Sequence, residues 1–415
     1  MLATNTLGDL LTTLLDRRQF GRRIEDGRKI KDLCLALLTE TDETSGRQLA
    51  AAILSRYRML DRDQKIAFFE FLNGELDLDA ARIAELAERY GSDSSPENFR
   101  ALVTASEPQR QTLFRQVNEA PGATAEIVRM RRDLLTFLEE RPELGRTDQD
   151  IVYLLRNWFN RGFLVVRQIN WESPASILEK IIAYEAVHEI GTWDDLRRRL
   201  QPTDRRCLAF FHPSMPDEPL IFVVVALTNG MPNSIQSVLS EEREVLDAED
   251  ADTAVFYSIS NCQKGLAGVS FGNSLIKQVA HDLSHDLPKL KAFATLSPIP
   301  GLLRWLQDEG IPDRGDDPRF MARVAAKYLL DAKAPDGLPL DPVARFHLGN
   351  GAILHAIHSD ADRSATGIAQ SSGVMVNYLY DLPRIAQNTI QFSKRREVAA
   401  TTTVRNLAKR ATMAS

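Results

Sequence analysis

Residues 255–301 bring together the side chains of this sequence that are best suited to chemistry. A β-branched and aromatic run at 255–259 is followed by a glycine-bearing turn, a helix-period run and a second strand pattern that ends at Ser297. This order predicts a strand, loop, helix, strand unit of an open α/β sheet. Glycines let backbone N–H groups approach a ligand, and amides at the N-terminus of the next helix suit a pyrophosphate. Ser297 stands at a strand end, where open sheets place reactive groups.

Ser297 and His347 carry side chains that could take part in catalysis. An imidazole holds a transferable proton near neutral pH, and a serine can relay a proton or hold a carboxylate. Each residue also has a structural interpretation. A serine before Pro298 is typical of a turn, and a histidine between Phe346 and Leu348 is typical of a core. The residues alone leave both interpretations open.

The spacing of the histidines favours solvated surfaces over metal sites. His281 and His285 stand four residues apart on a predicted helix, but acidic residues alternate with them and no third ligand is in view. His355 and His358 form a looser set near two aspartates. We therefore predict no metal site.

The composition is that of a soluble globular protein without a nucleic-acid or membrane partner. The 415 residues are 44% hydrophobic and 26% charged, with a net charge of −6. The longest apolar run, 220–227, is too short to span a bilayer, and the amphipathic first twenty residues do not match a signal peptide. The cysteines are isolated and odd in number (Cys34, Cys207, Cys262), which suits a reducing compartment. We predict a cytoplasmic location.

Periodicity divides the chain into three parts. Residues 1–158 repeat apolar side chains at intervals of three and four with almost no strand pattern, which predicts an all-α helical bundle. Acidic residues interleave the seven arginines of 129–161, which favours a solvated helix face over a nucleic-acid stripe. Residues 159–393 mix strands and helices, with a hairpin at 206–228. Residues 394–415 are predicted to be a basic, frayed tail.

A set of short segments runs in one order through about 220 residues of the chain. They lie at 160–164, 185–188, 205–207, 218–227, 256–260, 265–269, 275–277, 296–301, 346–352 and 377–380. Together they resemble the malonyl-CoA decarboxylase family, and the helical N-terminal third matches that family in character. The sequence departs from the family pattern at two places: Ser270 stands where some relatives carry Glu, and residues 357–360 replace a usual Ile-Asn-Trp. The second departure affects the detail of the substrate pocket.

The resemblance implies an α+β fold, in which an N-terminal all-α helical bundle (1–158) precedes a GNAT-like α/β catalytic domain with a mixed sheet (159–393). It implies malonyl-CoA as substrate, acetyl-CoA and CO2 as products, and no cofactor. By matching motifs, His347 is the expected proton donor and Ser297 the expected proton acceptor or carboxylate-orienting group. The expected substrate-binding residues are Ala267, Gly268, Val269, Ser270, Phe271, Gly272 and Asn273 of the coenzyme A loop, with Ser258 and Tyr380 lining the site.

Other functions stay open at this point. A GNAT-like sheet also suits acyl transfer to an amine, and a Ser/His pair suits thioester hydrolysis, although Ser297 lacks the Gly-x-Ser-x-Gly context of a nucleophile elbow. A non-catalytic module that senses acyl-CoA would use the same glycine loop. The N-terminal helices carry no visible chemistry, so we predict that they form a homo-oligomer, for example a tetramer.

Overall fold

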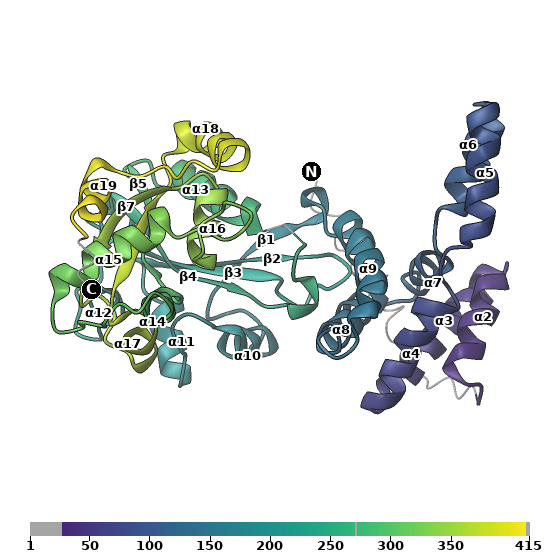
Figure 1. The fold of residues 1–415 in the computed structure, drawn as a ribbon. Helices are drawn as coiled ribbons and strands as arrows, with labels where there is room; N and C mark the ends of the chain where they lie inside the picture. Colours follow the sequence, from purple (N-terminus) through teal and green to yellow (C-terminus); the bar gives the residue numbers. More distant parts are fainter. Residues whose placement is uncertain (1–26, 270–271, 412–415) are drawn as a thin grey trace. The chain divides into compact units, whose positions relative to one another are not determined.

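The structure, a computed structural model, describes residues 27–269 and 272–411. The chain separates into two compact units (Figure 1). The first unit takes Met1–Leu164, His212–Pro216 and Gln263–Ser270, and the second takes Val165–Phe211, Asp217–Cys262 and Phe271–Ser415. The boundary expected between residues 158 and 159 remains a prediction.

Helices dominate the described part of the first unit. They are α2 (Ile30–Thr39), α3 (Glu43–Arg58), α4 (Arg62–Gly74), α5 (Ala80–Ser92), α6 (Pro96–Ala105), α7 (Gln109–Val117), α8 (Ala123–Leu135) and α9 (Gly145–Trp158). Several begin at a polar cap, as where Asp61 accepts a hydrogen bond from the Gln64 N–H at 2.9 Å. Phe69, Phe114 and Ile151 are among the apolar side chains buried in this unit. The predicted helical N-terminal region is confirmed.

Two arginines of the 129–161 run have a structural role that charge patterning did not predict. Arg131 of α8 is buried and pairs with Asp148 of α9 at 2.8 Å. It also donates to the carbonyl oxygens of Gly265 and Ala267, each at 2.7 Å. Arg156 donates to the carbonyl of Gly268 at 3.1 Å. A buried guanidinium needs such partners, so Arg131 lies in the interior of the unit and not on a solvated face.

The second unit is built on one mixed sheet. Its strands are β1 (Val165–Ile169), β2 (Arg205–Phe211), β3 (Ile221–Thr228), β4 (Thr253–Asn261), β5 (Ala292–Thr295), β6 (Ser297–Pro298), β7 (Ile353–His358) and β8 (Met375–Leu379). They lie in the order β1-β2-β3-β4-β5-β8-β6, and β7 pairs with β8. Strands β4 and β5 are parallel, and the other strand pairs of the described sheet are antiparallel, as the hairpin at 206–228 predicted for β2 and β3. The mixed sheet is confirmed.

The register of β4 determines where the sheet can hold a ligand. Thr253 to Phe256 pair with Ala292 to Thr295, and the β4–β5 ladder ends there. Beyond it, β4 continues to Asn261 while paired to β3. Strand β5 is followed by Ser297 of β6, which pairs with Val376 of β8. Because the ladder ends before β4 does, the far half of β4 and Ser297 border an opening in the sheet.

Helices surround this sheet in the second unit. They are α10 (Ala175–Tyr184), α11 (Trp193–Leu200), α12 (Ile235–Leu239), α13 (Gly272–Asp286), α14 (Leu302–Asp308), α15 (Pro318–Asp331), α16 (Pro342–Gly349), α17 (Ala365–Ser371), α18 (Ile385–Ile390) and α19 (Thr402–Lys409). Ile181 and Leu196 of α10 and α11 share a core with Val224 and Tyr257 of the sheet. Helix α13 and strand β5 complete the β4–α13–β5 unit that the sequence predicted.

Residues 394–415 were expected to form a frayed tail, but part of this segment is the helix α19. Helix α19 packs against α15, and its Val404 is fully buried. A strongly one-sided apolar pattern on a short helix gives it one face to bury, even though the surrounding residues are basic. No helix in the part of the chain that the structure describes is long and apolar enough to cross a membrane.

Candidate active site

Ser297 is positioned by the step from β5 to β6. The Leu296 N–H donates to the Phe256 carbonyl at 3.2 Å, which holds the end of β5 beside β4. The buried Ser297 hydroxyl donates to Thr295 Oγ1 at 2.8 Å. Thr295 and Ser297 are two residues apart, so the strand pleat places them on one face. The backbone therefore holds the serine side chain in one direction.

His347 is positioned by helix α16. Asp341 caps this helix by accepting from the Ala344 N–H at 2.9 Å, and Pro342 occupies its first turn. His347 falls in the last turn, where its ring stacks on Tyr378 of β8 with centroids 4.6 Å apart. Its Nε2 lies 3.2 Å from Ser297 Oγ. Its Nδ1 lies 2.8 Å from the hydroxyl of Tyr380.

Burial decides the protonation of this cluster. It lowers the pKa of His347 to about 3, so the imidazole is neutral at physiological pH. Burial also raises the pKa of Tyr380 well above its ordinary value, so the phenol keeps its proton. A neutral imidazole has one donor and one acceptor nitrogen. Because the Ser297 hydroxyl gives its single proton to Thr295 Oγ1, it accepts from Nε2, so the imidazole proton lies on Nε2 and Nδ1 accepts from the Tyr380 hydroxyl.

A cavity of about 240 Å³ opens beside these side chains within the second unit. Ser297 and His347 line this cavity together with apolar side chains that include Phe256, Ile259 and Phe346. Apolar walls exclude water and strengthen the electrostatic interactions of whatever binds there. The arrangement suits a small acyl group placed against a neutral proton donor.

The glycine loop belongs to the first unit up to residue 270. Gly268 has a positive φ of 77°, which a residue with a side chain adopts only with strain. A Cβ at Gly265 would lie 1.9 Å from the Val128 carbonyl oxygen, so only glycine fits there. Arg131 and Arg156 donate hydrogen bonds to carbonyl oxygens of this loop, and these bonds fix its backbone conformation.

Comparison with known proteins identifies the chain's relatives. The family models for the N-terminal and C-terminal domains of malonyl-CoA decarboxylase match residues 76–159, and 162–318 and 316–415. The crystal structure of malonyl-CoA decarboxylase from Agrobacterium vitis is 46% identical, covers 91% of this chain and 99% of its own, and has a TM-score of 0.86. That from Rhodopseudomonas palustris is also 46% identical, covers 91% and 98%, and has a TM-score of 0.85. The mitochondrial malonyl-CoA decarboxylase of Anser anser anser is 33% identical over 85% of this chain and 81% of its own length.

The chain belongs to the malonyl-CoA decarboxylase family. The resemblance drawn from the sequence is therefore confirmed, and so is the assignment to a family of enzymes. The predicted helical N-terminal region and the mixed sheet of the domain that follows it are confirmed as well, while the GNAT-like character of that domain remains a prediction.

The residues expected to form a malonyl-CoA decarboxylase site lie in several separate places. Ser297, His347 and Tyr380 meet in one hydrogen-bonded cluster. Ala267, Gly268 and Val269 lie in the loop of the first unit, while Gly272 and Asn273 begin α13 in the second. Ser270 and Phe271 lie outside the described residues.

Ser258, the remaining expected residue, makes contacts on β4 that differ from those of the cluster. Its hydroxyl lies 2.8 and 2.7 Å from the two carboxylate oxygens of Glu185, whose side chain is fully buried. The 185–188 segment supported the family resemblance, but nothing in it indicated this contact. Thr295 and Tyr378 were also missed. The i, i+2 spacing of Thr295 and Ser297 is the one signal that would have linked them.

The histidines and cysteines weighed as possible metal ligands or nucleophiles do not form a further site among the described residues. Within the described ranges, no three His, Cys, Asp or Glu side chains gather as metal ligands would. The cysteines are free and buried, and burial raises the pKa of the Cys34 thiol to about 12, which makes it unreactive.

Proposed function

We propose that this chain decarboxylates malonyl-CoA to acetyl-CoA and CO2. The observation that carries the proposal is the buried Ser297–His347–Tyr380 cluster beside a cavity of about 240 Å³, in a chain of the malonyl-CoA decarboxylase family. The reaction consumes one proton: the carboxylate leaves as CO2, and the carbon that carried it takes up hydrogen.

The chemistry needs an electron sink and a proton donor. Breaking the C–C bond sends an electron pair into the thioester carbonyl as an enolate, which hydrogen-bond donors stabilise by roughly 3 kcal/mol each. The enolate carbon then takes a proton. A neutral imidazole suits this step because the thioester enolate is a far stronger base than an imidazole that has lost its proton.

His347 is the proposed proton donor. Its Nε2 proton points toward Ser297, and the Tyr380 phenol can donate to Nδ1 as Nε2 loses its proton. The imidazole then stays neutral and the negative charge passes to the Tyr380 oxygen. A proton from solvent restores the phenol after the product leaves, which balances the reaction.

The position of the Ser297 hydroxyl allows two roles, and we propose both. Its hydroxyl contacts Nε2 of the imidazole and Ser297 lines the cavity, so the hydroxyl can accept the imidazole proton and pass its own to the carbon. It can also hold the departing carboxylate of the substrate. Both roles require the hydroxyl to stay oriented, which the Thr295 contact supports.

The substrate's coenzyme A part is proposed to bind through the loop at 267–273, which includes Gly268 and the start of α13. We further propose a cytoplasmic homo-oligomer that needs no metal, biotin or nucleotide. The N-terminal helices are its proposed interface.

Incubation of the purified protein with malonyl-CoA tests the proposal. Decarboxylation yields CO2 and acetyl-CoA, hydrolysis yields free coenzyme A thiol and malonate, and acyl transfer yields nothing until an amine is added. We expect the first outcome, unchanged by EDTA. Thiol release without CO2, or binding of malonyl-CoA without turnover, would contradict it.

A further inference from the structure

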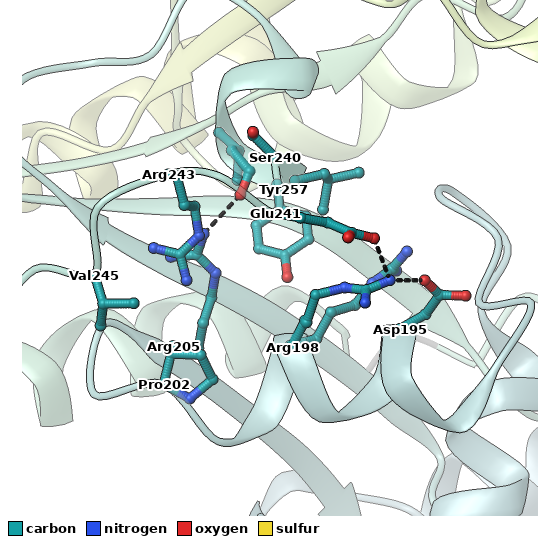
Figure 2. Close-up of a pocket in the computed structure, with 12 residues that line it drawn as sticks. Asp195, Arg198, Pro202, Arg205, Ser240, Glu241, Arg243, Val245 and Tyr257 are labelled. Carbon is teal, nitrogen blue, oxygen red and sulfur yellow. Dashed lines mark hydrogen bonds and ion pairs between the residues drawn. The ribbon is translucent and has the colours of Figure 1, made fainter.

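A second pocket of the second unit is lined by arginines that the proposed reaction does not use. It has a volume of about 330 Å³. Arg198 and Arg199 reach it from α11, Arg205 from the start of β2, and Arg243 from the segment after α12. We call it the arginine pocket. Figure 2 shows Arg205 and Arg243 on one side of the Tyr257 hydroxyl and Arg198 on the other.

Backbone carbonyls hold the two most deeply buried arginines. Arg199 is 7% exposed and donates to the carbonyls of His188 and Glu189 at 2.7 and 2.9 Å. Arg205 is 4% exposed and donates to the carbonyls of Asp204 and Val238 at 3.0 and 2.6 Å. These bonds use two of the five N–H groups on each guanidinium. They fix its direction without neutralising its charge.

The carboxylates near the inner wall are shared. Asp204 pairs with Arg243 and also lies 3.2 Å from Arg205, while the closest carboxylate contact of Arg199 is Glu185 at 3.9 Å. Neither acid lines the pocket. The three guanidinium groups of Arg199, Arg205 and Arg243 therefore share only these two carboxylates as nearby negative charges among the described residues. At the other side, Asp195 and Glu241 are each paired with Arg198.

Tyr257 is the second, independent indication of a ligand. The side chain is 1% exposed, and its hydroxyl has no hydrogen-bond partner among the described residues. The Arg205 guanidinium lies near this hydroxyl, but a guanidinium can only donate, so the phenol proton has no acceptor among the described residues. Burial raises the pKa of Tyr257 to about 12, so the phenol is a proton-bearing donor. A buried donor without a partner is costly, and a bound acceptor would remove that cost.

We propose that the arginine pocket binds a small organic oxyanion, a carboxylate or phosphate ester, whose charged group is held by Arg199, Arg205, Arg243 and Tyr257. Guanidinium groups favour such anions because two N–H groups match two oxygens. The walls formed by Pro202, Val238, Leu239 and Val245 accommodate the uncharged part of the ligand. The volume is that of a small-molecule site.

The pocket adjoins the decarboxylation cavity, because Tyr257 lines both. The test must therefore separate the two. We would titrate inorganic phosphate, and in a second series malonate, into the full-length protein saturated with acetyl-CoA, using isothermal calorimetry. Saturable binding of either anion with acetyl-CoA present is expected, and the tighter one identifies the charged group.

Matched variants assign that binding to the pocket. Arg243→Gln should weaken it by about ten-fold or more, because a hydrogen bond to a charged group is lost. Tyr257→Phe should weaken it about three- to ten-fold. Arg206→Gln removes an equal charge beside Arg205 but outside the pocket lining, and Tyr378→Phe removes another buried, unpartnered hydroxyl. Both controls should leave the Kd unchanged.

Three results would overturn the proposal. They are no saturable binding, equal weakening by Arg243→Gln and Arg206→Gln, and complete loss of binding when acetyl-CoA is present. The last would make the pocket part of the substrate site. If Arg243→Gln fails to fold, Tyr257→Phe decides alone, since deleting an unpartnered hydroxyl leaves the ring packing intact.

Discussion

Two cavities of the second unit share strand β4 and bury polar groups in opposite ways. Beside Ser297 the groups are neutral and bond to one another in a chain that ends at Tyr380. In the arginine pocket the groups carry permanent charge, and one hydroxyl has no partner within the described residues. A neutral chain moves a proton without separating charge, whereas guanidinium groups do not give up protons at all. The first arrangement therefore suits chemistry and the second suits binding.

Replacing His347 is the most direct way to break this comparison. His347→Asn keeps a hydrogen-bonding side chain of similar size but removes the transferable proton. We expect kcat to fall about 10²–10⁴-fold with little change in KM, because general acid catalysis contributes on that scale. Steady-state kinetics measures this, with circular dichroism to confirm folding. Near-normal kcat in the folded variant would make His347 a core residue and leave Tyr380 as the next candidate.

Asp341 caps the helix that carries His347. Its buried carboxyl tests what it costs to ionise a group near the neutral Ser297–His347–Tyr380 cluster. Burial raises its pKa from 3.8 to about 6. The unfolded chain ionises near pH 4 and the native state near pH 6, so the free energy of unfolding falls as pH rises between them. The loss is up to about 3 kcal/mol.

Asp341→Asn keeps an oxygen for the Ala344 N–H and removes this pH dependence. Compared with the variant, the wild-type protein should lose stability between pH 4 and pH 6. Chemical denaturation at pH 4, 5, 7 and 8 measures the difference. Parallel pH profiles for the two proteins would show that Asp341 ionises normally.

Ser297→Ala sharpens the comparison within the cluster. We expect kcat to fall about ten- to a hundred-fold, less than for His347→Asn, because His347 keeps its proton when the hydroxyl is lost. Thr295→Val is the matched control for orientation, since it removes the partner of Ser297 and leaves the hydroxyl itself. A larger loss for Thr295→Val than for Ser297→Ala would contradict this order of importance.

Two tyrosine substitutions give the smallest expected effect and the most direct contrast. Tyr380→Phe removes a hydroxyl bonded to His347 and should cost about 1 kcal/mol of stability. Tyr257→Phe removes a buried hydroxyl without a partner and should be neutral or slightly stabilising in the absence of ligand. Denaturant midpoints measure both. Equal destabilisation would mean that the Tyr257 hydroxyl is satisfied in solution.

Much of this architecture follows from local pattern. The β-branched run at 255–259 and the apolar run at 220–227 became β4 and β3, because strands buried on both faces read as continuous apolar segments. Strand β8 was harder to predict. It pairs with β5, β6 and β7, and such long-range pairings leave no trace in spacing.

The sequence by itself determined the family, the helical first unit, the mixed sheet, and Ser297 and His347 as candidates, because these depend on motifs and periodicity. Only the tertiary structure decided which groups touch. It joined Tyr380 to His347, directed Ser258 toward Glu185, and gathered arginines from α11, β2 and the segment after α12 around Tyr257. The physical reason is burial: a side chain's protonation and partners depend on what surrounds it, and those neighbours are remote in sequence.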